Sequence, residues 1–181
     1  MAKFSVVLAD PPWNYKGQTQ HGASGEGTGS AEAHYPTMKL EALKALKVAD
    51  ICEKDAVLFL WTSSPHLPQA LEVMKAWGFG FSTIAFVWDK QRVNPGYWTM
   101  SQCEIVLCGK RGKFPARGSR NERQFVSSLR RAHSQKPDEV RERIGKMFPA
   151  VKKVELFARQ RVEGWEAWGN EVESEVVIGV A

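Results

Sequence analysis

The chain has 181 residues, 43% of them apolar and 25% charged, which favours one globular domain spanning 1–181 and excludes a disordered chain. No apolar run approaches the ~20 residues of a membrane span, and no signal peptide is evident, so we expect no membrane partner. Three scattered cysteines argue against a disulfide scaffold and favour a reducing, cytoplasmic location. The net charge of +5 is compatible with a polyanionic partner.

A short apolar run, Phe4–Ala9, predicts a buried strand, and Asp10-Pro11-Pro12-Trp13 follows it directly. The prolines keep the chain after Asp10 stiff and extended. Such a loop presents a carboxylate, a backbone carbonyl and an aromatic face together, which suits a planar ligand that carries an amino group. An ordinary turn with Trp13 in the core is an equal alternative for this motif alone.

Residues 14–34 are polar and glycine-rich, and we expect them to form a mobile lid beside Asp10, although an unstructured loop with no role is the alternative. Thr37 is a candidate N-cap for a helix over Lys39–Ala49. Further on, a strand is predicted over Val57–Trp61 and a helix over Pro65–Trp77.

The second half alternates in the same way. Expected elements are strands over Ser82–Trp88, Glu104–Cys108, Gln124–Leu129 and Lys153–Arg159, a helix that begins near Lys136, a short element over Trp165–Glu171 and a tail over 172–181. Lys110–Arg131 is strongly basic and contains one acid, Glu122; it is either a phosphate-contacting segment or a solvated loop.

Alternating strands and helices predict an α/β sheet with helices on both faces. Ligands of such sheets bind outside the carboxyl ends of the strands. Asp10, Thr62, Asp89 and Arg159 all follow or end predicted strands, so we expect them at one edge of the sheet.

Six segments carry a more specific signal. They are Asp10-Pro11-Pro12-Trp13, His34-Tyr35-Pro36-Thr37-Met38, Leu58-Phe59-Leu60-Trp61, Glu104-Ile105-Val106-Leu107-Cys108-Gly109, His133-Ser134-Gln135-Lys136-Pro137-Asp138-Glu139 and Glu155-Leu156-Phe157-Ala158-Arg159. In this order and spacing they resemble the MT-A70 family of S-adenosylmethionine-dependent adenine N-6 methyltransferases, which includes bacterial and phage members. The resemblance implies a Rossmann-like, three-layer α/β/α sandwich with a permuted motif order, in which the substrate loop precedes the cofactor-binding strand.

By the resemblance, the catalytic group is Asp10, Pro11, Pro12 and Trp13. Asp10 and the Pro11 carbonyl would accept hydrogen bonds from the adenine amino group, and Trp13 would stack on a base flipped out of the duplex. The substrate-binding residues would be Tyr35, Trp98 and Glu104. For Glu104, a solvated position on the strand is the alternative.

On the cofactor side, the resemblance implies that S-adenosylmethionine contacts Ser134, Lys136, Phe157, Arg159, Asn170 and Glu171. Lys136 would lie near the methionine carboxylate, whereas Arg159, Asn170 and Glu171 would reach the ribose and adenine. Ser134 could instead be only a helix cap. One departure from the family is that Arg161 and Val162 stand where the messenger-RNA enzymes carry a His-Asn pair.

Together these features predict an adenine N-6 methyltransferase that acts on nucleic acid, DNA rather than RNA because the chain is minimal, as a monomer or homodimer. A catalytically inactive, nucleic-acid-binding partner subunit is the alternative, although such relatives are expected to have lost the acid of the Asp10 loop. No metal is expected, since the four histidines show no ligand spacing.

Overall fold

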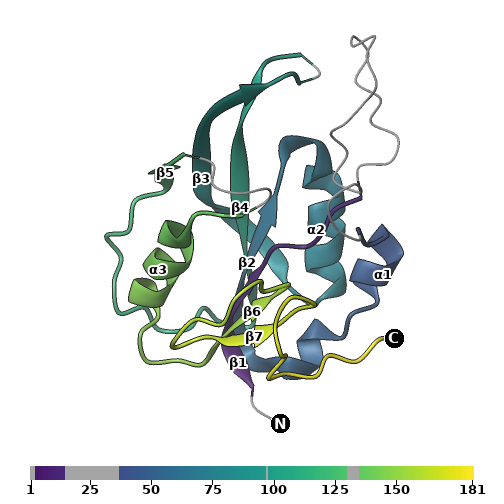
Figure 1. The fold of residues 1–181 in the computed structure, drawn as a ribbon. Helices are drawn as coiled ribbons and strands as arrows, with labels where there is room; N and C mark the ends of the chain where they lie inside the picture. The colour runs from purple at the N-terminus through teal and green to yellow at the C-terminus, as the bar shows by residue number, and fades with distance from the viewer. Residues whose placement is uncertain (1–2, 15–36, 97, 130–134) are drawn as a thin grey trace.

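A seven-stranded sheet forms the centre of the computed structural model, which describes residues 3–14, 37–96, 98–129 and 135–181 (Figure 1). Along the chain the strands are β1 (Phe4–Ala9), β2 (Cys52–Thr62), β3 (Gly80–Asn94), β4 (Ser101–Arg111), β5 (Phe125–Ser127), β6 (Lys153–Leu156) and β7 (Glu166–Trp168). In space their order is β5-β3-β4-β2-β1-β6-β7. The predicted lid over 14–34 lies almost entirely outside the described residues.

The strand β4 runs antiparallel to both of its neighbours, β2 and β3. The other four pairings in the described part of the chain are parallel. At the centre, Val7 of β1 is opposite Leu58 of β2 on one side and Val154 of β6 on the other. All three side chains are buried, as expected of parallel strands covered on both faces.

Helices cover both faces of this sheet (Figure 1). They are α1 (Leu40–Lys44), α2 (Leu67–Ala76) and α3 (Asp138–Met147), with 3-10 turns at η2 (Val48–Ile51) and η3 (Ser64–His66). The apolar stripes of α1 and α2 enter one core cluster, and Val140 and Ile144 of α3 enter a second cluster with Phe59 of β2. The predicted three-layer α/β/α sandwich is therefore confirmed.

The first helix is shorter than the predicted Lys39–Ala49, and Lys39 rather than Thr37 is its N-cap. The C-terminal tail explains the early end. The Lys47 amide donates to the Gly179 carbonyl at 2.9 Å, and the Ala181 amide donates to the Ala45 carbonyl at 2.8 Å. A longer helix would need these backbone groups for itself.

Several predicted strands also have different ends. The strands β2, β3 and β4 extend well beyond their apolar centres, because polar residues continue the pairing where the sheet meets solvent. Asp89 consequently lies inside β3 and not at a strand end. In contrast, β6 stops at Leu156 because Phe157 adopts a φ of 61°, which turns the chain away before Arg159.

We expect Phe59→Ala to lower the free energy of unfolding by about 3–5 kcal/mol, since it leaves a cavity at the centre of the sheet. Phe59 is 1% exposed, and its ring packs 6.2 Å from that of Phe86 and 6.2 Å from that of Phe148. Phe81→Ala is the matched control because Phe81 is 53% exposed. Urea unfolding curves measure both; equal losses would contradict this assignment of the core.

Candidate active site

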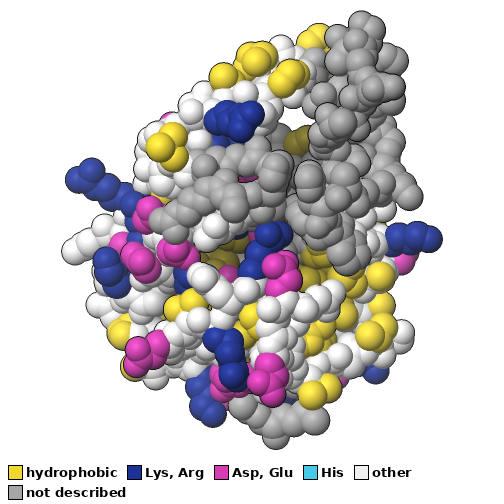
Figure 2. All heavy atoms as spheres, in the orientation of Figure 1, with side chains coloured by type: hydrophobic (Ala, Val, Ile, Leu, Met, Phe, Trp, Pro, Cys, Tyr) yellow, Lys and Arg dark blue, Asp and Glu magenta, His cyan; other side chains and the backbone are white. Residues whose placement is uncertain are grey.

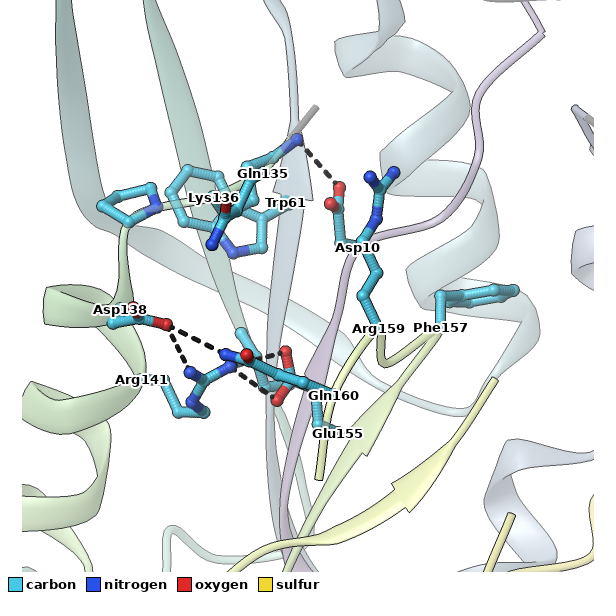
Figure 3. Close-up of a pocket in the computed structure, with 12 residues that line it drawn as sticks. Asp10, Trp61, Gln135, Lys136, Asp138, Arg141, Glu155, Phe157, Arg159 and Gln160 are labelled. Atoms are coloured by element: carbon cyan, nitrogen blue, oxygen red, sulfur yellow. Dashed lines mark hydrogen bonds and ion pairs between the residues drawn. The ribbon is translucent and has the colours of Figure 1, made fainter. Parts of the chain in front are cut away.

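A cavity of ≈ 250 Å³ opens at the carboxyl edge of the parallel strands (Figure 3). Its wall includes Asp10, which follows β1, and Phe157 and Arg159, which follow β6. Lys136 and Asp138, at the start of α3, complete the opposite side. Leu8 of β1 and Trp61 of β2 also line it, so its polar residues come from one early loop and two late segments, while the two central strands contribute apolar side chains. This is the order that the resemblance implies.

Four charged side chains alternate in sign beside this cavity. Lys136 Nζ lies 3.1 Å from Asp10 Oδ1 and 3.2 Å from Glu104 Oε2, and Figure 3 shows it directed at Asp10. Lys90 Nζ lies 3.4 Å from the other oxygen of Glu104. Lys136 also lies 5.6 Å from the centroid of the Trp61 ring, so a cation–π contact supports it. We call Asp10, Lys136, Glu104 and Lys90 the charge chain.

Burial and neighbouring charges compete within the charge chain. For Asp10, burial dominates and raises the pKa, although Lys136 opposes this shift. Burial would also raise the pKa of Glu104, but Lys136 and Lys90 together outweigh burial and lower it. For Lys136, burial favours the neutral form, yet the two carboxylates overcome burial and raise the pKa. Lys136 is therefore a cation that both acids hold in place.

Backbone hydrogen bonds fix the Asp10 loop on both sides. The Asp10 amide donates to the Leu156 carbonyl at 3.4 Å, and the Met38 amide donates to the Pro12 carbonyl at 2.9 Å. Within the loop, the Trp13 amide donates to the Pro11 carbonyl at 2.9 Å. A carbonyl has two lone pairs, so the Pro11 oxygen retains the capacity to accept one more hydrogen bond.

Trp13 itself is part of the core. It is 7% exposed, its Nε1 donates to the Trp61 carbonyl at 3.2 Å, and its ring stacks on that of His66 at 5.9 Å. Two interpretations of the motif were given above. The position of Trp13 fits an ordinary turn with this residue in the core, whereas the position of Asp10 fits a loop that binds the amino group of a ligand. The placement of Trp13 gives stacking on a base no support; it supports a role in holding the loop.

The predicted cofactor residues converge at the end of β6. The Ala158 amide donates to the Trp168 carbonyl at 2.9 Å, and Phe157 packs edge-on against Trp168 at 5.2 Å. Arg159 Nε lies 3.5 Å from Glu171 Oε1. Phe157 and Arg159 line the cavity, whereas Asn170 and Glu171 are exposed outside its wall. Arg161 pairs with Glu175 at 2.6 Å.

Other predicted residues lie elsewhere. Tyr35 and Ser134 fall outside the described residues, so their roles stay predictions. Glu104 is in the charge chain and is not a solvated strand residue. Trp98 is 98% exposed on the connection between β3 and β4, and it is not part of the cavity wall.

One cluster on the cavity wall was missed from the sequence. Arg141 of α3 pairs with Glu155 of β6 at 3.0 Å and with Asp138, which also accepts a hydrogen bond from Gln160 (Figure 3). Burial raises the pKa of Glu155, and Arg141 opposes the rise. Two signals could have found this cluster. Asp138 and Arg141 are three residues apart on a helix, and an acid inside an apolar strand requires a cation.

The basic segment does not gather at the cavity. Arg111 is opposite Ala56 near the start of β2, at the far edge of the sheet from Asp10. From there the chain passes beside α3, where the Gly118 amide donates to the Met147 carbonyl at 2.8 Å. Arg130 and Arg131 lie outside the described residues. The described part of the segment therefore lies away from the cavity, and its contact with phosphates stays a prediction.

Among the described residues, no group of three or more His, Cys, Asp or Glu side chains could hold a metal ion. Burial raises the pKa of the Cys52 thiol to about 12 and that of Cys108 to about 11, so neither thiol is activated. None of the described helices combines the length and apolar character that crossing a membrane requires.

The ion pairs of Glu104 predict a pH-dependent loss of stability in Glu104→Gln. Because the folded state holds the pKa of Glu104 below its ordinary value of 4.5, its ionised form stabilises the protein above that pH. At pH 7 we expect the variant to be about 2 kcal/mol less stable. The difference should shrink as the pH falls below 4.5, where Glu104 becomes protonated in both the folded and the unfolded state.

Urea unfolding of both proteins between pH 3 and pH 7 measures this difference. Glu41→Gln is the control, since Glu41 is exposed and its ion pair with Lys44 lies near solvent. A stability difference that is constant over the whole pH range would contradict the assigned ion pairs.

Comparison with known proteins identifies the family of this chain. The MT-A70 family model matches residues 4–171. The type II methyltransferase M.MunI of Mycoplasma sp is 45% identical over 182 residues, which cover 94% of this chain and 78% of that protein. The N(6)-adenosine-methyltransferase catalytic subunit METTL3 of Homo sapiens is 26% identical, and the N(6)-adenosine-methyltransferase MT-A70-like protein of Drosophila melanogaster is 28% identical.

Each of the two animal proteins aligns with 96% of this chain, but the chain spans only 29% and 28% of their lengths. The family match covers nearly the whole chain and includes both Asp10 and Arg159. The resemblance found in the sequence is confirmed, and this chain belongs to the MT-A70 family of methyltransferases.

Proposed function

We propose that the protein transfers a methyl group from S-adenosylmethionine to the exocyclic N-6 amine of adenine in DNA. The observation that carries the proposal is the state of the Asp10 carboxylate. Lys136 Nζ holds this carboxylate by an ion pair at 3.1 Å to Oδ1, and Asp10 lines the cavity. A carboxylate that is held in place at a cavity wall has further lone pairs, with which it can accept an N–H from a ligand.

The Pro11 carbonyl provides a second acceptor in the same loop. An adenine amino group has two N–H bonds, which match the Asp10 oxygen and this carbonyl. Accepting both N–H bonds withdraws the nitrogen lone pair from conjugation with the ring and directs it at the methyl donor. As the N–CH3 bond forms, the S–CH3 bond of the donor would break and leave a neutral thioether. Asp10 would stabilise the positive charge that develops on the nitrogen, and the N–H proton would then pass along its hydrogen bond to Asp10 and on to water.

The cavity chemistry fits the cofactor. When bound, S-adenosylmethionine supplies an electrophilic methyl group on a sulfonium. Lys136 and Arg159 are cations on the wall that can bind its carboxylate or hydroxyl groups, and Phe157 offers an aromatic edge. Glu171, paired with Arg159, and Asn170 would reach the ribose from the rim.

The choice of DNA rests on similarity. The relative named a type II methyltransferase is 45% identical, whereas the two named adenosine methyltransferases are 26% and 28% identical. The names of the two less similar relatives specify adenosine, which is a ribonucleoside. The greater similarity to the type II methyltransferase supports our choice of DNA, and RNA is the competing substrate in the test.

Asp10→Asn should reduce methyl transfer by at least about 100-fold, because the amide presents neither the charge nor both acceptor oxygens. Transfer of labelled methyl from S-adenosylmethionine to adenine-containing DNA and RNA measures the effect. Asp50→Asn is the matched control, since Asp50 is exposed and distant from the cavity. Mapping of methylated adenines in DNA from a methylation-free host that expresses the protein identifies the target sequence.

Equal incorporation by Asp10→Asn and the wild type would overturn the mechanism. Incorporation into RNA alone would overturn the choice of DNA. An inactive partner subunit would show neither incorporation nor heat of binding when the wild type is titrated with S-adenosylmethionine.

Gly169→Ala should weaken binding of S-adenosylmethionine by about tenfold or more, or ~1.4 kcal/mol. A Cβ at Gly169 would lie 2.4 Å from the Ala158 carbonyl oxygen, so the Phe157–Arg159 turn must move. Gly145→Ala is the control: no atom lies within 4 Å of its Cβ, and on α3 it should stabilise the helix by up to ~1 kcal/mol. Calorimetric titration measures both, and unchanged affinity in Gly169→Ala would remove this turn from the cofactor site.

A further inference from the structure

The hairpin that joins β3 and β4 extends past the rest of the sheet (Figure 1). The last residue of β2, Thr62, is opposite Ile105, whereas β4 begins four residues earlier, at Ser101, which is opposite Asn94. At ~3.3 Å per residue the hairpin rises roughly 13 Å beyond this edge. We call the described residues 91–96 and 98–101 the arm. It projects from the same edge that carries Asp10 and the cavity.

The arm exposes apolar side chains where a soluble surface normally avoids them. Val93, Trp98 and Met100 are all exposed, and Trp98 is 98% accessible. Figure 2 shows hydrophobic side chains gathered at the top of the molecule, where Figure 1 places the end of the hairpin. The segment between Asp89 and Glu104 contains the cations Lys90 and Arg92 and no acid. Exposed apolar side chains next to positive charges suit DNA, which carries charged phosphates on its outside and stacked bases inside.

The base of the arm is fixed to the candidate site. Asp89 Oδ1 accepts hydrogen bonds from the Gln91 amide at 2.9 Å and from Gln102 Nε2 at 2.6 Å. Lys90, the residue before the arm, is the outer member of the charge chain and pairs with Glu104. The position of the arm is therefore set relative to Asp10.

We propose that the arm enters the major groove of duplex DNA and that Trp98 stacks into the space that the target adenine leaves when it flips into the active site. This inference rests on the proposed function. A two-stranded ribbon fits the major groove, which is ~8.5 Å deep, so an arm of roughly 13 Å reaches the base stack. The predicted substrate role of Trp98 is thereby assigned to the duplex around the target and not to the cavity.

The protein surface near the arm favours nucleic acid over a protein partner. Apolar side chains at the tip alone would suit either. The arm, however, projects from the edge of the sheet that carries Asp10, and its only charged residue is the cation Arg92. A flipped base leaves an unstacked gap, which apolar side chains fill in proteins that open a duplex.

The test uses a duplex oligonucleotide built around an adenine found methylated in the expressing host, and a second duplex with an abasic site opposite that adenine. On the matched duplex, Trp98→Ala should lose about 10- to 100-fold in kcat/KM, and Trp98→Phe should recover most of the activity. On the abasic duplex, where flipping is easier, the loss should largely disappear. Affinity for S-adenosylmethionine should not change.

Phe114→Ala is the matched control, because Phe114 is an exposed aromatic that lies against Lys110 at the far edge of the sheet. It should behave as the wild type on both duplexes. With 2-aminopurine in place of the target adenine, the wild type should raise fluorescence on binding, and Trp98→Ala should raise it much less.

Three results would overturn the inference. Trp98→Ala could methylate the matched duplex as fast as the wild type, or it could lose the same factor in kcat/KM on both duplexes. Sedimentation could also show that Trp98→Ala differs from the wild type in oligomeric state. The last would make the arm a contact between copies of the chain. Failure of the proposed function is distinct, since the wild type itself would then methylate no DNA.

Discussion

The site depends on Lys136, because two carboxylates lie at one edge of the sheet and only a shared cation makes their proximity favourable. Lys136 lies 3.1 Å from Asp10 and 3.2 Å from Glu104, and Lys90 pairs with the outer oxygen of Glu104. Without the cation, two like charges at partly buried positions would repel, and one would take up a proton. Lys136 reaches this place because α3 packs against the sheet through Val140 and Ile144. Core packing thus determines the electrostatics of the site.

The sequence predicted the strand that precedes Asp10, since a short apolar run followed by an acid and two prolines rarely forms a helix. It could not predict why Glu104 lies near Asp10. The run Glu104–Cys108 indicates a strand but does not indicate whether it is parallel or antiparallel to its neighbours. Because β4 is antiparallel to β2, Glu104, near the start of β4, lies at the edge where β2 ends. In a parallel strand it would lie at the opposite edge. The resemblance, and not the pattern, had placed Glu104 beside the substrate.

Other features that the sequence pattern did not predict share one physical cause, which is that distant backbone groups compete with local preferences. The predicted helix over Lys39–Ala49 ends early because the tail pairs with residues 45–47, and Val176 and Ile178 of this tail enter the core. Trp13 belongs to a loop motif, yet its indole donates to a carbonyl of β2 and packs against His66. Periodicity within a window cannot detect such contacts. The pair Arg141 and Glu155 was missed for the same reason, since 14 residues separate its members.

The charge chain also suits the proposed function, in which one site binds a base and positions it for methyl transfer. The Asp10 carboxylate would keep its ion pair with Lys136 while it accepts an N–H from the base, so little reorganisation would be needed when the base arrives. Lys90, at the end of the charge chain opposite Asp10, connects the charge chain to the base of the arm. If the arm binds DNA as proposed, it would hold the duplex in a fixed position relative to Asp10 before the adenine is flipped. The two proposals then predict two kinds of defect. Changes at the tip of the arm would impair the opening of the duplex, whereas changes within the charge chain would impair methyl transfer to an adenine that has already entered the site.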